Sequence, residues 1–361
     1  MPTKTKNILI CPLDWGLGHA TRCVPIIKML IDKGANVTIG ADNRPLAFLK
    51  EEFPNLPFVK FPGYNIRYPE NRSMVLKMLI SFPKILKKLR EEHIFLKKII
   101  SDYSIDIVIS DNRFGLWNKK TKCIYITHQL NIKCPSWLRI FEYVLFKINK
   151  YFIDKYDECW IPDKENLNIS GELTRNYKSF KNIHYIGLLS RFYQNINTSE
   201  SKPKYDVICI LSGPEPQRTI FENIILKQIR KNNIIRILIV RGLTESSASE
   251  KLQENVLFTD HLETDTLFQA ISEADIIICR PGYTSIMDII TIGKKAIFVP
   301  TPGQTEQEYL AEYYKNRGWF YSINQKKFNL FRSLEKSKFY PGWKAKYDNE
   351  DLADRVNFWL D

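Results

Sequence analysis

Two histidines and one aspartate stand where apolar strand-like runs give way to polar loops. The first loop, residues 14–22, follows the run 7–12 and reads Asp-Trp-Gly-Leu-Gly-His-Ala-Thr-Arg. Its glycines let the backbone approach a ligand, and the helix that follows offers N–H groups to an anion. His19, at the start of that helix, is therefore a candidate general base. The alternative is a glycine turn with a capping histidine.

A second polar loop begins at Asp111, after the apolar run 106–110. An acid there either caps the next helix or orients a base. If the strands before the two loops are neighbours, Asp111 can hold the His19 imidazole in one tautomer, in a relay that ends on a substrate hydroxyl. A third loop, 127–131, reads Thr-His-Gln-Leu-Asn and suggests a hydrogen-bonding platform. His128 in it is the second candidate for the base, or a structural histidine.

Three strand-to-helix loops of the second half are suited to a phosphorylated ligand. In the loop 211–218, Ser212 and Gly213 can present a hydroxyl and an N–H to phosphate, and Arg218 adds positive charge. In the segment 279–288, Cys-Arg-Pro-Gly-Tyr-Thr-Ser-Ile-Met-Asp, we expect Arg280 and the helix start to hold a diphosphate.

One turn further, the Asp288 carboxylate can accept from both hydroxyls of a ribose. A plain capping box between Ser285 and Asp288 is the alternative. The proline-bracketed loop 300–308 follows the next strand, and its Gln307 and Glu308 can bond sugar hydroxyls.

Alternating strands and helices must position these loops, and the pattern predicts parallel sheets with crossover helices. We predict two doubly wound, Rossmann-like α/β domains, because the alternation stops in the polar stretch 188–204 and then restarts. The domains are residues 1–190, a linker at 191–204, residues 205–345, and a terminal helix within 346–361. Predicted strands are 7–12, 36–40, 57–61, 105–109, 122–127, 157–161, 183–187, 205–211, 234–240, 255–258, 274–279 and 295–299. Predicted helices are 20–33, 74–100 with a break at Pro83, 135–152, 217–231, 264–271, 284–293 and 305–317.

The composition fits two globular domains, since 361 residues with 44% hydrophobic and 26% charged residues can fill two cores. The sequence contains no uninterrupted run of about 18 apolar residues, so we expect no ordinary membrane-spanning helix. The amino terminus lacks a signal-peptide core, which indicates the cytoplasm. The seven cysteines form no C-x-x-C, so we expect reduced thiols and no zinc site.

The positive charge is unevenly distributed along the chain. Residues 1–150 hold 25 Lys and Arg against 12 Asp and Glu, whereas residues 151–361 hold 28 of each. The basic half also contains two apolar helical stretches, 74–100 and 137–153. These features predict peripheral attachment to an anionic membrane surface, with a lysine-rich solvent coat as the alternative. No nucleic-acid module is present, so nucleic acid is not an expected partner.

The second-half loops resemble those of the two-domain GT-B glycosyltransferases, and most closely family 28, the branch that contains the lipid II-forming N-acetylglucosaminyl transferases. The resemblance rests on R-P-G-Y-T-S-x-x-D followed by P-T-P-G-Q-T-E-Q-E-Y, and it extends over the whole chain. It implies two domains that face each other across a cleft, a final helix that crosses back to the amino-terminal domain, a UDP-sugar donor, and a lipid-linked or glycan acceptor.

Carried over by position, the resemblance assigns roles to single residues. His19 matches the histidine of the amino-domain glycine loop, and residues 128–131 resemble an H-E-Q-N motif. Asp288 would meet the ribose, and Leu262 would offer backbone groups to uracil. The other donor-binding residues are Ser212, Gly213, Arg218, Arg280, Gly282, Thr284 and Ser285 at the phosphates, and Gln304, Gln307 and Glu308 nearer the sugar.

The residues also indicate how the reaction proceeds. Retaining enzymes of this fold usually carry two acids eight positions apart, but Arg280 stands eight before Asp288, so an inverting displacement is expected. The sequence has no D-x-D, so we expect no metal and no cofactor. Two alternatives remain: a UDP-sugar 2-epimerase, whose H-x-E-A-G-x-R stretch has no match here, and a non-catalytic membrane-docking protein.

Overall fold

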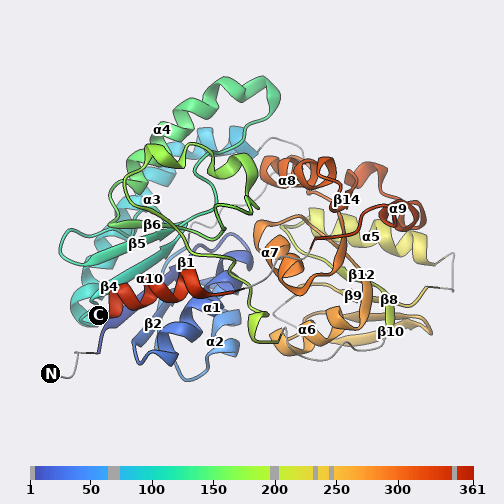
Figure 1. The fold of residues 1–361 in the computed structure, drawn as a ribbon, viewed down its shortest axis with the longest axis horizontal. Helices are drawn as coiled ribbons and strands as arrows, with labels where there is room; N and C mark the ends of the chain where they lie inside the picture. Colours follow the sequence, from blue (N-terminus) through green and yellow to red (C-terminus); the bar gives the residue numbers. More distant parts are fainter. Residues whose placement is uncertain (1–4, 64–73, 196–202, 231–234, 244–247, 344–347) are drawn as a thin grey trace. The chain divides into compact units, whose positions relative to one another are not determined.

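The computed structural model describes residues 5–63, 74–195, 203–230, 235–243, 248–343 and 348–361, with backbone alone for 74–83, 85, 251 and 252. The chain divides into two compact units. The first holds every element up to Ser190 together with the last helix, and the second begins at Arg191. Each unit is a parallel or mostly parallel sheet with helices packed on it (Figure 1).

The first unit contains a seven-stranded parallel sheet in the order β3-β2-β1-β4-β5-β6-β7. Its central strands are apolar and buried because helices cover a parallel sheet on both faces. They are β1 (Asn7–Pro12), β2 (Asn36–Ala41), β3 (Phe58–Lys60), β4 (Ile107–Asp111), β5 (Lys122–Ile126), β6 (Glu158–Ile161) and β7 (Ile183–Tyr185). The helices are α1 (Gly18–Asp32), α2 (Asn43–Glu52), α3 (Met74–Asp102), η1 (Ser136–Phe141), α4 (Glu142–Ile153) and α10 (Glu350–Leu360), with short 3-10 turns η2 (Gly171–Thr174) and η3 (Tyr177–Ser179).

The second unit contains a seven-stranded sheet in the order β10-β11-β9-β8-β12-β13-β14. All neighbours are parallel except the edge strand β10, which is antiparallel to β11. The strands are β8 (Tyr205–Ile210), β9 (Ile237–Val240), β10 (Ser249–Gln253), β11 (Val256–Thr259), β12 (Ala274–Cys279), β13 (Lys295–Phe298) and β14 (Tyr321–Ser322). The helices are α5 (Gln217–Ile229), α6 (Thr264–Ser272), α7 (Tyr283–Ile292), α8 (Thr305–Asn316) and α9 (Leu330–Ser337), with 3-10 turns η4 (Tyr193–Asn195) and η5 (Gln325–Lys327).

In both sheets the strand order reverses at one place, where the loops that leave two neighbouring strands lead away in opposite directions. In the first unit this place lies between β1 and β4, with Pro12 opposite Asp111. In the second unit it lies between β8 and β12, with Ile210 opposite Cys279. Open α/β sheets bind their ligands at such points, outside the carboxyl ends of the strands. Within each unit, the fold therefore brings together the loops that carry the predicted site residues.

The last helix, α10, belongs to the first unit and packs against α1. Leu352 and Val356 are buried on one side of it. The Glu158 carboxylate at the start of β6 accepts hydrogen bonds from Arg355 and from Trp359 Nε1, the latter at 3.0 Å. This buried carboxylate ties the end of the chain to the first sheet.

The structure corrects several predicted elements. Helix α3 runs without interruption through Pro83, so the predicted break is wrong. Strand β4 begins two residues later than predicted and ends on Asp111, which places that residue at the carboxyl-terminal end of a central strand. Strands β10 and β14 and helices α2 and α9 had no predicted counterpart.

Among the described helices, none combines the length and the apolar character that a bilayer crossing requires.

Candidate active site

The first-unit site centres on the carboxylate of Asp111, the last residue of β4. The His19 Nδ1 lies 2.9 Å from Asp111 Oδ1, so the two residues form the predicted pair. His19 does not cap its helix, because the N-cap residue of α1 is Leu17 and no side chain bonds there. The imidazole is 14% exposed, whereas the carboxylate is fully buried. The buried acid can therefore orient a histidine that remains accessible.

Arg22, a residue that the sequence analysis did not single out, lies at the centre of this site. It follows His19 by one turn of α1 and is 1% exposed. Its Nε donates to Asp111 Oδ2 at 2.5 Å, and its Nη2 donates to Asp111 Oδ1. Its Nη1 lies 2.8 Å from His128 Nδ1, at the carboxyl end of β5. Arg22 thus joins the three residues that the sequence predicted as catalytic.

The charges around Asp111 favour its ionised form. Burial alone would raise the pKa of this carboxyl group, but the Arg22 guanidinium and the His19 hydrogen bond outweigh burial. Together they lower the pKa of Asp111 from 3.8 to about 2. The carboxylate is therefore charged at neutral pH and acts only as a hydrogen-bond acceptor.

Neighbouring helices hold the two loops that carry Asp111 and His128. After β4, the buried Arg113 donates to Glu92 of α3 at 2.8 Å. Gly115 packs so closely on α3 that an added Cβ would lie 2.6 Å from the Glu92 carboxylate. After β5, the buried amide of Asn149 in α4 donates to the carbonyls of residues 129 and 130, at 2.7 and 2.9 Å. These contacts fix the site without taking part in it.

The H-E-Q-N-like stretch is only partly available to a ligand. Asn131 donates to the backbone carbonyls of Glu172, Leu173 and Arg175, so it anchors η2 to the loop. His128 is 6% exposed and faces Arg22. Of this stretch, His128 alone joins the Asp111 cluster.

In the second unit, helices α5, α7 and α8 begin at the carboxyl ends of the adjacent strands β8, β12 and β13. No side chain caps any of the three. The N-cap of α7 is Gly282, so the capping box between Ser285 and Asp288 is wrong. Gly213 has φ +102°, and an added Cβ would lie 3.6 Å from Thr301 Oγ1, which shows that the first and third loops are close. Backbone N–H groups at such helix starts attract anions.

The structure places Arg280 away from solvent and gives it backbone partners. It is 1% exposed. Its Nη1 donates to the carbonyls of Val299 and Pro300 at 2.9 and 3.2 Å, and its Nη2 donates to Gln217 O at 3.0 Å and Gln325 Oε1 at 2.5 Å. The guanidinium also lies over the Phe221 ring. In the unliganded protein these bonds form a brace that joins the β13 loop to the start of α5, and the expected diphosphate contact stays a prediction.

Arg218 is likewise committed to protein partners. Its Nε donates to Glu215 at 2.6 Å and its Nη1 donates to Glu222 at 2.7 Å, and the side chain is 6% exposed. Glu222 also accepts from Arg241 at 3.1 Å, and Arg241 in turn donates to Asp260 at 2.9 Å. This chain of ion pairs links the loops after β8, β9 and β11. In the unliganded protein Arg218 therefore holds these loops in position, and its expected phosphate contact stays a prediction.

The remaining predicted donor residues lie in the loop after β8, in α7 and around the start of α8. Asp288 is 7% exposed and lies 3.8 Å from the Nε of Arg191, a residue that the sequence analysis assigned only to the linker. Thr284 is buried, Ser285 is half-buried and Ser212 is exposed. Gln307 and Glu308 accept from the N–H groups of Thr301 and Gly303, each at 2.9 Å. In the described chain, the buried Oε1 of Gln304 and Oγ1 of Thr301 have no protein partner.

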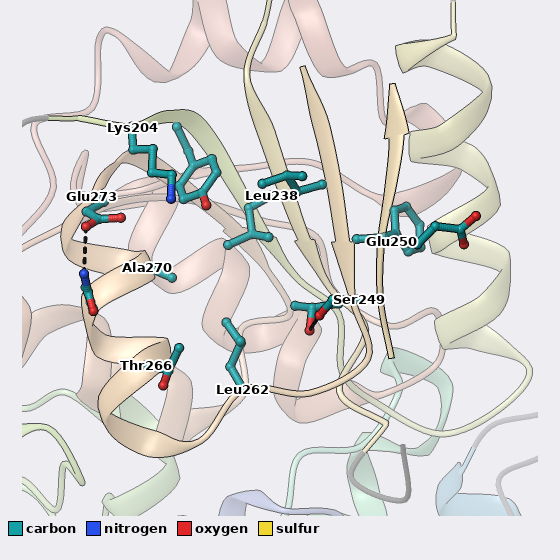
Figure 2. Close-up of a pocket in the computed structure, with 13 residues that line it drawn as sticks. Lys204, Leu238, Ser249, Glu250, Leu262, Thr266, Ala270 and Glu273 are labelled. Carbon is teal, nitrogen blue, oxygen red and sulfur yellow. Dashed lines mark hydrogen bonds between the residues drawn. The ribbon is translucent and has the colours of Figure 1, made fainter. Parts of the chain in front are cut away.

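Leu262, the predicted contact of the uracil ring, lines a hollow of about 390 Å³. Figure 2 shows that Leu262 and Leu238 lie around this hollow, together with Ala270 of α6. Lys204 and Glu273 lie at one end, by the amino ends of β8 and β12, so the hollow extends away from the phosphate loops.

The seven cysteines are all free thiols. Among the described residues, no three His, Cys, Asp or Glu side chains form a group that could hold a metal ion.

Comparison with known proteins gives consistent matches for both units. Residues 207–339 match the glycosyltransferase family 28 C-terminal domain, and residues 7–133 match glycosyl transferase family 1. An uncharacterized glycosyltransferase of Methanosarcina acetivorans is 24% identical over 341 residues, 87% of this chain and 84% of its own. The UDP-N-acetylglucosamine--N-acetylmuramyl-(pentapeptide) pyrophosphoryl-undecaprenol N-acetylglucosamine transferase of Francisella philomiragia is 24% identical over 85% of this chain and 80% of its own.

Solved structures share the fold at lower sequence identity. The crystal structure of Acinetobacter baumannii MurG superimposes with a TM-score of 0.57 at 13% identity, covering 98% of this chain and 99% of that one. At this identity the likeness supports the fold alone.

Proposed function

Because the chain is a family 28-like glycosyltransferase with the GT-B fold, we propose that it transfers an N-acetylhexosamine or hexose from a UDP-sugar to a hydroxyl group of a lipid-linked or glycan acceptor. The observation that carries this proposal is the hydrogen bond between His19 and Asp111 at the reversal point of the first sheet. It leaves the Nε2 of a partly exposed histidine to take the proton of an acceptor hydroxyl.

The donor binds in the second unit, at the carboxyl ends of β8, β12 and β13. The diphosphate lies at the uncapped start of α7, where backbone N–H groups and the hydroxyls of Thr284 and Ser285 face its negative charge. Asp288 accepts from the ribose hydroxyls, with Arg191 as its neighbour in the unliganded protein. The unpartnered oxygens of Gln304 and Thr301 are suited to the sugar. Arg280 acts indirectly, by holding the loops that carry these groups.

The displacement is inverting and uses no metal ion in this proposal. Deprotonated by His19, the acceptor oxygen attacks the anomeric carbon while UDP departs on the opposite side. The helix N–H groups stabilise the charge that develops on the departing diphosphate. Two features of the sequence support this: the absence of a D-x-D, and Arg280 in place of an acid eight residues before Asp288.

We place the acceptor at the inner face of a membrane, with the protein attached peripherally from the cytoplasm. A surface of η1 and α4, which we call the η1–α4 patch, supports this location. It exposes the apolar side chains of Trp137, Ile140, Phe141, Tyr143, Val144 and Tyr151. Arg139 and Lys147 are exposed beside them, so the patch suits an anionic lipid surface. The acceptor named for the Francisella relative, a pyrophosphoryl-undecaprenol, is also lipid-linked.

The donor class can be tested by thermal unfolding with a panel of nucleotide sugars. A ligand that binds only the folded protein raises the melting temperature, and at a fixed concentration the rise is larger for a ligand of higher affinity. We expect UDP-sugars to raise it and GDP- and dTDP-sugars at the same concentration to raise it less. A larger shift with a GDP- or dTDP-sugar would replace UDP in the proposal, and no shift with any nucleotide sugar would contradict it.

A further inference from the structure

We infer that Arg22 is a positioning residue that acts with Asp111 to fix opposite tautomers on two histidines, so that His19 is the base and His128 is a hydrogen-bond donor. Arg22 sets the tautomer of His128 directly, and it holds the Asp111 carboxylate that sets the tautomer of His19. The inference rests on the proposed function for the meaning of these roles, but the tautomers themselves are a property of the unliganded protein. Arg22 reaches both rings from one buried guanidinium, which lies 2.8 Å from His128 Nδ1 and 3.0 Å from His19 Nδ1.

The tautomer of His128 follows from the chemistry of arginine. A guanidinium group has only donors, so the Nη1 of Arg22 can bond His128 Nδ1 only if that nitrogen carries a lone pair. The proton of the neutral ring is then on Nε2. A second proton on Nδ1 would place two N–H groups head to head beside a buried positive charge. His128 is thereby held neutral with an Nε2–H, and it offers a proton to an acceptor atom instead of removing one.

The tautomer of His19 is set by Asp111. Its Nδ1 lies 2.9 Å from Asp111 Oδ1, an oxygen that can only accept. A lone pair on Nδ1 would repel that oxygen, whereas an N–H forms a charge-assisted bond with it. Arg22 Nη2 donates to the same oxygen, so its nearness to His19 Nδ1 needs no bond of its own. The lone pair of His19 is then on Nε2, the nitrogen that a base requires.

Arg22 can serve both rings because of its place in the fold. It follows His19 by three residues in α1, which puts the two side chains on the same face of the helix. Strand β5 brings His128 to the other side of the guanidinium, and β4 brings Asp111 between them. A lysine at this position would keep the charge, but its single ammonium lacks the planar fork that bonds Asp111 and His128 together.

The test is nitrogen NMR of the full chain with 15N-labelled histidine, which needs no substrate. The protein has five histidines, and the signals of His19 and His128 are assigned by His19→Gln and His128→Gln. In the wild type we expect an Nδ1–H ring for His19 and an Nε2–H ring for His128 at neutral pH. In Arg22→Lys we expect His128 to lose its single tautomer and give averaged shifts. The matched control is Arg236→Lys, which alters a surface ion pair with Asp206 and should leave both rings unchanged.

Two results would overturn the inference: a wild-type His128 that carries its proton on Nδ1, or an Arg22→Lys variant with both wild-type tautomers. If Arg22→Lys does not fold, the wild-type spectrum still decides the tautomers. Because no step depends on the donor or the acceptor, a failure here would leave the proposed glycosyl transfer standing, and an absence of nucleotide binding would leave the tautomers untouched.

Discussion

Arg280 lies within hydrogen-bond distance of three backbone carbonyls, which come from the β13 loop and the start of α5. Its replacement by alanine would remove the hydrogen bonds that the guanidinium donates to them, and the carbonyls of Val299 and Pro300 among them are buried. An unpaired buried polar group costs about 1 to 3 kcal/mol. We therefore expect Arg280→Ala to lower the free energy of unfolding by about 3 kcal/mol or more, measured by chemical denaturation.

The control for Arg280→Ala is Arg236→Ala, which removes an exposed ion pair with Asp206 and should leave the free energy of unfolding nearly unchanged. Loss of UDP binding without loss of stability would instead support the diphosphate contact that the sequence suggested for Arg280.

Asp111 makes the stability of the first unit depend on acid pH. Its pKa is lowered in the folded protein to about 2, from 3.8 in the absence of the fold, by Arg22 and His19 acting against burial. A carboxyl group with a lowered folded pKa stabilises the protein above its unfolded pKa and loses that contribution as the pH falls through its folded pKa. The difference in unfolding free energy between wild type and Asp111→Asn should therefore be constant above about pH 5 and shrink by about 2 kcal/mol as the pH falls toward 2.

Denaturation curves at several acid pH values measure this difference. A difference that stays the same from pH 5 to pH 2 would mean that Asp111 is not the charged partner of Arg22. The sign is specific, because a group with a raised folded pKa would show the opposite trend.

At the scale of the elements, the sequence predicted the strands that carry the site and their meeting point. Apolar runs such as 7–12 are long enough and well enough bounded to mark buried parallel strands, and the polar residues that follow mark the carboxyl edge. The pairing of His19 with Asp111 was predictable for this reason, since it needed only that β1 and β4 be neighbours.

The features that the sequence did not indicate depend on contacts between distant parts of the chain. In sequence, Arg22 reads as a charged residue on an amphipathic helix, and its burial appears only when β4 and β5 bring Asp111 and His128 to it. Arg280 was assigned to a ligand because a loop arginine near a glycine resembles a phosphate contact. Its carbonyl partners lie up to 63 residues away in sequence, and no local pattern indicates them. The edge strand β10 is short and pairs on one side only, so it gave no clear signal.

The η1–α4 patch gives the membrane proposal a surface that can be altered. We expect the wild type to sediment with anionic vesicles at low salt, and less at high salt or with neutral vesicles, because each Lys or Arg near an anionic surface contributes about 1 kcal/mol. Replacing Trp137 and Ile140 together by serine should abolish most of the binding. These side chains are 65% and 82% exposed, so the change should leave the fold intact.

The matched control for the patch is Phe339→Ser, which removes an apolar side chain that is 84% exposed in the second unit. It should bind vesicles like the wild type. Equal, negligible sedimentation of the wild type with both vesicle types would point to a small acceptor in solution. Equal loss in the control would mean that the η1–α4 patch is not the docking surface.

In the proposed reaction the two units of the molecule have different roles. The first unit holds the His19, Asp111 and Arg22 cluster and the η1–α4 patch, and the excess positive charge of the sequence lies within residues 1–150. The second unit has uncapped helix starts and the acidic side chain of Asp288 at the same sheet edge. This division is what the proposed transfer from an anionic donor to an acceptor at a membrane would require of the two units.

The most direct test of this account is calorimetric titration of UDP into the wild type and into Asp288→Ala, with Asp275→Ala as the matched control. Asp275 is an exposed acid at the start of β12, at the opposite end of the strand from the phosphate loops. We predict that UDP binds the wild type and Asp275→Ala equally and binds Asp288→Ala about ten- to a hundredfold more weakly, the loss of about 1.5 to 3 kcal/mol expected for hydrogen bonds to a charged group. Undiminished UDP affinity in Asp288→Ala, or no binding of UDP to the wild type, would contradict the assignment of the donor site.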